Sequence, residues 1–219
     1  MNGIRPVITL LKKEVLLEWR NRSVMGSLLL YSVLTVFLIF FSFRNLDPLS
    51  WATLFWIVMI FSSVDAVAKS FMQESQERWF YYYTLISPSQ LVIAKLVYNL
   101  LLMSLLSTFT LVLFSLFIGF PIHDYGYFLI ALSGGVICLT VLFTFMSVIA
   151  SKAGKNTALV TILSLPIAIP LMAVIINFTK KTLVVQNASI YFTDIVLLCA
   201  INILMLVMGY LLFQFSWKE

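Results

Sequence analysis

Long apolar runs dominate the pattern of hydrophobic and polar positions along this chain. About 20 apolar residues at a rise of 1.5 Å each are enough for a helix to cross a hydrocarbon core of about 30 Å. Six runs reach that length, with Asp65 as the one charged residue inside them, and none alternates with the period of a strand. They lie at residues 24–43, 49–68, 96–120, 125–150, 157–178 and 195–215.

Composition agrees with a chain that lies mostly in a membrane. Hydrophobic residues make up 62% and charged residues 11%, with a mean hydropathy of +1.04. A typical soluble domain has about 25% charged residues. The sequence therefore predicts an all-α integral membrane protein, with residues 1–219 forming a single transmembrane domain of six helices.

Basic residues gather on one side of the predicted spans. Of the 14 Lys and Arg residues, only Arg44, Lys180 and Lys181 fall on the second side if the N-terminus lies on the first. The positive-inside rule then places both termini in the cytoplasm. The net charge of +5 mostly reflects this bias, and the chain has no continuous basic face of the kind that binds nucleic acid.

The first 22 residues have the pattern of an amphipathic helix. Ile4, Ile8, Leu11, Val15 and Trp19 recur at steps of three or four, with basic residues elsewhere on the helical wheel. Such a helix is expected to lie in the cytoplasmic interface of the membrane. A topological anchor and a gating role both fit this pattern.

A charged and aromatic segment, residues 70–88, separates the second and third apolar runs. It contains Glu74, Glu77 and Arg78, followed by four consecutive aromatic residues, 80–83. Amphipathic aromatic rings are enriched in the headgroup zone of a membrane. The segment is therefore either a helix resting at the interface or a docking surface for a cytoplasmic partner.

Motifs for catalysis, nucleotide binding and metal binding are missing from the sequence. Gly154-Lys155 lacks the first glycine and the hydroxyl residue of a phosphate-binding loop, and His123 is the single histidine. No serine-hydrolase or metalloprotease motif occurs. We therefore expect a protein that is not an enzyme, binds no cofactor through a dedicated motif, and takes any energy of ATP hydrolysis from another chain.

A single charged residue, Asp65, lies within a predicted span, and Lys69 follows one helical turn later. Charged residues inside spans are rare and often functional. A local ion pair at the inner end of the span and an ion-coupling site are the two interpretations, of which the first is favoured because few other ionisable groups lie in the spans.

Two prolines, Pro166 and Pro170, lie four residues apart in the fifth run, so they share one helix face. Each removes a backbone hydrogen bond and crowds the preceding turn, so the span is expected to be kinked. The kink serves either packing geometry alone or a hinge that moves during transport.

Three stretches of the sequence, residues 10–21, 91–99 and 163–171, resemble the CcmB family, the B subunit of the haem exporter of bacterial cytochrome c maturation. The stretch "LSLPIAIPL", residues 163–171, resembles the family's L-x-L-P-x-x-I-P-L pattern. "LVIAKLVYN", with Lys95, is similar to the start of the family's third span, and "LLKKEVLLEWRN" is similar to its amphipathic first helix. Length, six spans and an inside N-terminus agree over essentially the whole chain.

The resemblance implies an ABC-2-like permease subunit in the bacterial inner membrane. Its expected partners are a separate cytoplasmic ABC ATPase, a haem-handling membrane subunit, a small accessory subunit and a second copy of itself. Haem is the expected transported or handled substrate, delivered to a periplasmic chaperone. Residues 70–88 would be the coupling helix, with Glu74, Glu77 and Arg78 facing the ATPase. The alternatives are an ABC-2-like permease for a lipid, polysaccharide or drug, and a non-transporting membrane scaffold.

Overall fold

The computed structural model describes residues 4–20, 22–43, 46–72, 88–152, 157–184 and 191–218. These residues form seven α-helices and no strand. The helices are α1 (Ile4–Arg20), α2 (Arg22–Ser42), α3 (Pro48–Met72), α5 (Pro88–Phe117), α6 (Tyr125–Lys152), α7 (Thr157–Val184) and α8 (Tyr191–Lys218).

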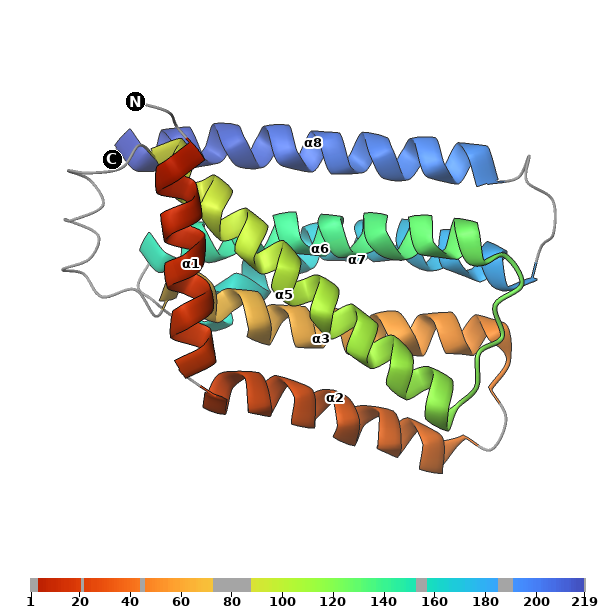
Figure 1. Ribbon diagram of the computed structural model, residues 1–219. Helices are drawn as coiled ribbons and strands as arrows, with labels where there is room; N and C mark the ends of the chain where they lie inside the picture. The colour runs from red at the N-terminus through yellow and green to blue at the C-terminus, as the bar shows by residue number, and fades with distance from the viewer. Residues whose placement is uncertain are drawn as a thin grey trace.

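Six of these helices run along the length of the molecule, and α1 lies across one end of them (Figure 1). Successive long helices run in opposite directions, and both chain termini lie at the end where α1 lies. We call this the terminal end, and the opposite one the far end. The arrangement places α1, the C-terminal part of α3 and the N-terminal part of α5 together at the terminal end.

Among the described residues, five helices are long and apolar enough to cross a membrane, which confirms a multi-pass membrane protein. Their apolar stretches are Pro48–Val67, Gln90–Phe117, Tyr125–Ala150, Ala158–Val184 and Tyr191–Leu211. The first predicted run lies in α2, whose apolar stretch, Gly26–Ser42, is shorter than the others. The all-helical class is therefore confirmed, whereas the count of six spans stays a prediction.

Helix α6 lies at the centre of the bundle, between α3, α7 and α8. In an 18-residue window of its apolar stretch, 72% of the residues are buried within the chain, against 11% in the corresponding window of α8. A side chain at Gly135 of α6 would collide with Trp56 of α3 and Ile175 of α7. The absence of a side chain there allows the three helices to approach closely, as small residues do in membrane bundles.

A tryptophan and a glycine fix the far ends of α3 and α5. Trp51 is buried and stacks on Phe55, with ring centroids 5.5 Å apart. Its indole Nε1 donates a hydrogen bond to the carbonyl oxygen of Gly119 at 3.0 Å. Gly119 has a φ of 102°, a left-handed conformation that favours glycine, and it follows the last turn of α5. The chain therefore turns sharply after α5 and is held against α3.

Helix α1 ends at Arg20, slightly earlier than the predicted segment 1–22, and Arg22 begins α2. Leu10 and Glu14 are the buried residues of its described part, whereas Ile8 and Val15 of the predicted apolar stripe are about half exposed. The face of α1 that packs on the bundle therefore differs from the apolar stripe found in the sequence. Whether that stripe contacts a membrane surface stays a prediction.

Both prolines predicted as a kink lie inside α7, which remains helical from Thr157 to Val184. Pro166 and Pro170 are exposed, whereas Ala168 and Leu171 beside them are buried. The two prolines therefore share a face that turns away from the core of this chain. Their role as a hinge stays a prediction.

Asp65 lies on α3 and is exposed. The side chain of Lys69, its predicted partner, lies outside the described part of the structure. The pairing of the two residues therefore stays a prediction.

Candidate functional site

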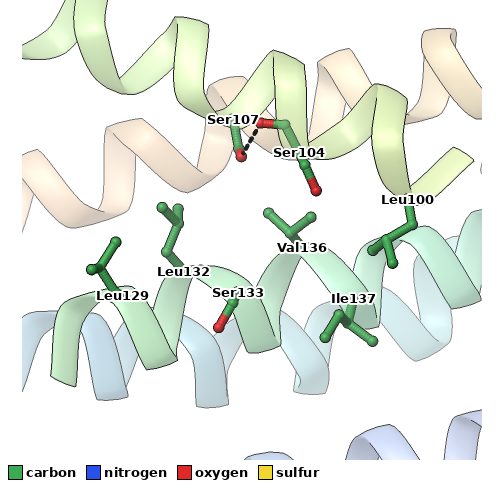
Figure 2. Close-up of a pocket in the computed structure, with 8 residues that line it drawn as sticks. All are labelled: Leu100, Ser104, Ser107, Leu129, Leu132, Ser133, Val136 and Ile137. Carbon is green, nitrogen blue, oxygen red and sulfur yellow. Dashed lines mark hydrogen bonds between the residues drawn. The ribbon is translucent and has the colours of Figure 1, made fainter. Parts of the chain in front are cut away.

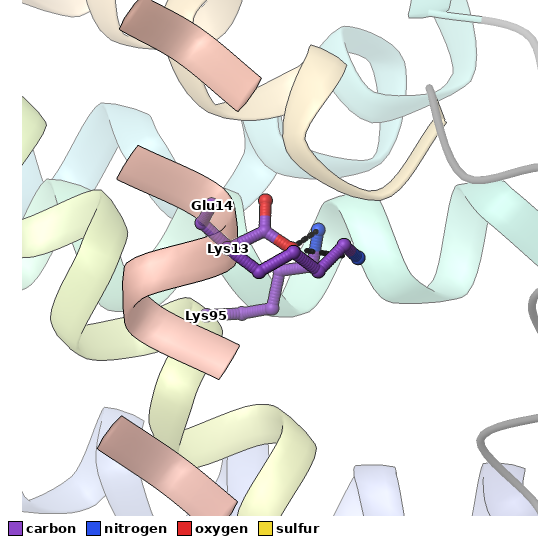
Figure 3. A network of polar contacts seen from close by, with 3 residues as sticks. All are labelled: Lys13, Glu14 and Lys95. Carbon is purple, nitrogen blue, oxygen red and sulfur yellow. Dashed lines mark hydrogen bonds and ion pairs between the residues drawn. The ribbon is translucent and has the colours of Figure 1, made fainter. Parts of the chain in front are cut away.

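A buried ion pair joins α1 to α5 at the terminal end. The Glu14 carboxylate oxygen Oε1 lies 3.2 Å from the Lys95 ammonium nitrogen Nζ. The Nζ of Lys13 lies 3.5 Å from the same oxygen. The Lys95 side chain is 2% exposed and that of Glu14 is 11% exposed. Figure 3 shows the two lysines converging on one carboxylate, Lys13 from α1 and Lys95 from α5.

Helical spacing brings these groups together. Leu10 and Glu14 lie one turn apart on the buried face of α1, and Leu91, Ala94 and Lys95 share a face of the first turns of α5. Leu10, Leu91 and Ala94 form one buried apolar cluster. The ion pair is thus flanked by apolar side chains that shield it from water.

Burial makes this pair costly to break. Taking two charges out of water costs several kcal/mol per ion, which the mutual attraction and hydrogen bonds must offset. Removal of one partner from a buried pair typically costs about 3–5 kcal/mol, because the other charge stays buried. The pair therefore contributes strongly to the fixed position of α1 on α5.

A second buried polar contact lies one turn further along α5. The Asn99 side-chain Nδ2 donates a hydrogen bond to the hydroxyl oxygen of Thr144 on α6, at 2.9 Å. Asn99 and Thr144 are both fully buried. Since Lys95 and Asn99 are four residues apart, they lie on one face of α5. Buried polar contacts therefore connect α1 with α5, and α5 with the central helix α6.

A different polar cluster closes the far end. The Tyr191 hydroxyl donates a hydrogen bond to Asp124 Oδ2 at 2.8 Å. Lys181 Nζ and Asp194 Oδ2 form an ion pair at 2.6 Å. The backbone N–H of Asp124 donates to the carbonyl oxygen of Thr182 at 3.3 Å. These contacts join the ends of α6, α7 and α8.

A shallow groove with a volume of about 250 Å³ lies between α5 and α6 (Figure 2). Most of its lining is aliphatic, and its polar residues are Ser104, Ser107 and Ser133. The Ser107 and Ser133 hydroxyls donate to backbone carbonyl oxygens of their own helices. The groove thus offers no charged group to a ligand.

The predicted coupling residues Glu74, Glu77 and Arg78 lie outside the described residues. The helices on either side of them are described, and both meet the segment at the terminal end: α3 finishes at Met72, and α5 starts at Pro88. Lys95 lies about two helical turns into α5. The buried ion pair is therefore close, along α5, to the segment predicted to dock a partner.

The contact between Glu14 and Lys95 was missed by the sequence reasoning. Lys95 stands alone at the start of a long apolar run, and Glu14 follows two lysines in an amphipathic helix. Each is the kind of charge that a membrane helix retains for a specific partner. Nothing in the spacing of either helix shows that the other one supplies that partner.

Among the described residues, no group of three or more His, Cys, Asp and Glu side chains is arranged to hold a metal ion. The two described cysteines, Cys138 and Cys199, are free. The polar groups at the two ends therefore form ion pairs and hydrogen bonds between helices, an arrangement suited to positioning helices.

Fold and site together define a multi-pass helical membrane protein whose charged contacts hold helices in place. A family model described as CcmB protein matches residues 5–216, and the chain belongs to this family. Membership implies the haem-exporter ABC permease subunit of cytochrome c maturation, a membrane subunit that is not itself an enzyme. Family members act with an ABC ATPase and other Ccm proteins. Searches of curated proteins and of solved structures found no significant match.

Proposed function

We propose that this chain couples ATP hydrolysis by a separate cytoplasmic ATPase to haem delivery on the periplasmic side of the inner membrane. The observation that carries the proposal is the family match over residues 5–216, which includes the predicted coupling segment and both helices of the buried ion pair. Haem is the transported or handled substrate. The other partners are a haem-handling membrane subunit and a small accessory subunit.

Topology supports the orientation that this function needs. Both termini lie at the terminal end, as does the attachment of residues 73–87 to α3 and α5. The excess of basic residues on that side favours the cytoplasm under the positive-inside rule. The ATPase would therefore meet α1 and the coupling segment from the same side of the membrane.

Transport would use two copies of the chain, because six helices alone form half of a pathway in ABC permeases. Helix α7 would contribute a hinge at Pro166 and Pro170. Each proline already removes one backbone hydrogen bond, so the helix can bend there without breaking a further one. Movement of the coupling segment would be converted into rearrangement of the bundle.

The first experiment deletes the gene in its native cell and quantifies haem covalently bound to c-type cytochromes on haem-stained gels. Loss of bound haem is expected, with apocytochrome still exported and with recovery on expression of the intact gene. Unchanged bound haem in a cell with no second copy would contradict the proposal and favour a permease for another substrate. Retained function with a hydrolysis-deficient ATPase would favour a scaffold.

A second experiment addresses the docking role. Charge reversal at Glu74, Glu77 and Arg78 together is expected to abolish co-purification of the ATPase, because the docking surface would then carry the wrong charges. Reversal of Asp47, an exposed charge at the far end, is the matched control and should leave co-purification intact. Equal co-purification of both variants would refute the docking role.

A further inference from the structure

The Glu14–Lys95 pair has a position that bundle stability alone does not require. The five long apolar helices and α2 pack together through their apolar faces, and α1 lies across their end (Figure 1). Helix α1 could be held there by Leu10 and its apolar neighbours. Instead, a lysine that is 2% exposed reaches a carboxylate on α1 at 3.2 Å. A buried charge pair gains little stability over an apolar pair of the same size, but it fixes one register.

We infer that Glu14 and Lys95 lock α1 and the first turns of α5 into one rigid unit, so that α1 moves with the segment that precedes α5. Lys95 acts here as a positioning residue. The inference deepens the proposed function and rests on it in one respect only, that the segment before α5 is moved by a partner. The holding of α1 by the pair is a property of this chain alone.

The direction of transmission follows from the contacts of α5. A displacement at Pro88 reaches Lys95 within about two turns of continuous helix, and an α-helix is stiff over that length. At Lys95 it passes to α1 through the ion pair, and one turn later Asn99 passes it to α6 through Thr144. Lys13, at 3.5 Å from Glu14, adds a second positive charge, and this contact lies within α1.

Spin-label distances in the purified full-length chain test the holding of α1. One label is placed at Lys12 on α1 and one at Ile93 on α5, both exposed positions next to the pair, after replacement of Cys138 and Cys199 by alanine. A narrow distance distribution is expected for the otherwise unchanged chain. Lys95→Met should broaden it by about twofold or more, because a neutral side chain no longer fixes the register.

Three further variants separate positioning from general loosening. Lys95→Arg and the double exchange Glu14→Lys/Lys95→Glu should restore the narrow distribution, since each restores opposite charges at the contact. Lys181→Met, which removes a lysine from the ion pair at the far end, should leave the distribution narrow. A distribution that stays narrow in Lys95→Met, or that broadens equally in Lys181→Met, would overturn the inference.

A disulfide tests whether the rigid unit persists during function. Leu10→Cys/Ala94→Cys, in the same cysteine-free background, joins α1 to α5 within their shared apolar cluster. Bound haem formed after a membrane-permeant oxidant has closed the disulfide is expected to stay within about twofold of that in equally treated cells carrying the cysteine-free chain, because the two helices need not move apart. A loss of bound haem that reduction reverses would overturn the inference.

The bound-haem measurement and the label distances test separate claims, so one claim can be contradicted while the other stands. If deletion of the gene left bound haem unchanged, the proposed function would fall, while the label distances would still decide whether the pair holds α1. If deletion abolished bound haem but Lys95→Met left the distances narrow, the proposed function would stand without this lock.

Discussion

The two ends of the bundle use ion pairs in different ways. At the terminal end, Glu14 and Lys95 come from helices far apart in the sequence, and Lys95 is 2% exposed. At the far end, Lys181 and Asp194 are 13 residues apart, and the Lys181 side chain is 34% exposed. The first pair attaches a crossing helix to the bundle, whereas the second closes the connection between two successive helices.

The difference shows that contact distance alone does not decide which ion pair contributes more to stability. The far-end pair has the shorter contact, 2.6 Å against 3.2 Å. Water can still solvate Lys181, so loss of its partner leaves a charge that is partly compensated. The Lys95 side chain is 2% exposed, so contacts within the protein, among them the one with Glu14, must supply nearly all of the compensation. The longer contact is therefore the more consequential one.

The largest effect is expected for Lys95→Met at the terminal end. The variant leaves the Glu14 carboxylate in its buried position with Lys13 at 3.5 Å as a weaker substitute. We expect a loss of about 3 kcal/mol in the free energy of unfolding, measured by thermal unfolding in detergent. Lys12→Met removes an exposed lysine from α1 and is the matched control. Equal effects of the two variants would contradict the role assigned to burial.

An intermediate effect is expected for Tyr191→Phe at the far end. Tyr191 is fully buried, and its hydroxyl donates to Asp124 Oδ2 at 2.8 Å. Because a hydrogen bond to a charged group contributes about 1.5–3 kcal/mol, the variant should lose about 2 kcal/mol of stability. Asp124→Asn in addition should cost less than it does in the unchanged chain, since the two residues share one contact. Strictly additive effects would show that this bond contributes little.

Sequence reasoning found the helices more readily than the contacts between them. Runs of apolar residues fix where a membrane helix lies, because each run must satisfy its own backbone hydrogen bonds within the bilayer. The helical class and most span positions were therefore predictable. The packing face of α1 was not, since Glu14 lies on it beside Leu10, and a carboxylate counts as polar in any periodicity argument.

The candidate site residues show the same division between features of a single helix and contacts between helices. Lys95 was noticed as part of a family-like stretch, but its partner depends on how α1 crosses the bundle, which no local spacing encodes. Glu74, Glu77 and Arg78 were chosen for their place between two spans and lie outside the described residues. Pro166 and Pro170 lie inside α7, where the sequence placed them in a single span, and their hinge role stays a prediction.

A smaller effect is expected for Asp194→Asn. This variant leaves the Lys181 ammonium, whose side chain is 34% exposed, so water replaces much of the lost contact and the expected loss is about 1 kcal/mol or less. Added salt should weaken the pair further in the unchanged chain, because mobile ions screen exposed charges. Lys95→Met at the terminal end should keep its full effect in salt. An Asp194→Asn effect that matches that of Lys95→Met, or that persists in salt, would remove the distinction between the two ends.

The smallest effect concerns Asp47, an exposed residue that caps α3 at the far end. Its carboxylate Oδ2 accepts a hydrogen bond from the backbone N–H of Ser50 at 3.2 Å. Hydrogen bonds from the Ser50 side chain and backbone lower the pKa of Asp47 below its ordinary value of 3.8.

A carboxylate whose pKa is lower in the folded state stabilises the fold at pH values above its ordinary pKa. This contribution is lost as the pH falls through the folded-state pKa. Asp47→Ala should therefore lower the melting temperature slightly at neutral pH and progressively less as the pH falls below 3.8. Asp47→Asn keeps a capping oxygen, so its melting temperature at neutral pH should lie between those of Asp47→Ala and the unchanged chain. A difference from the unchanged chain that grows on acidification would show that the cap does not act through the ionised carboxylate.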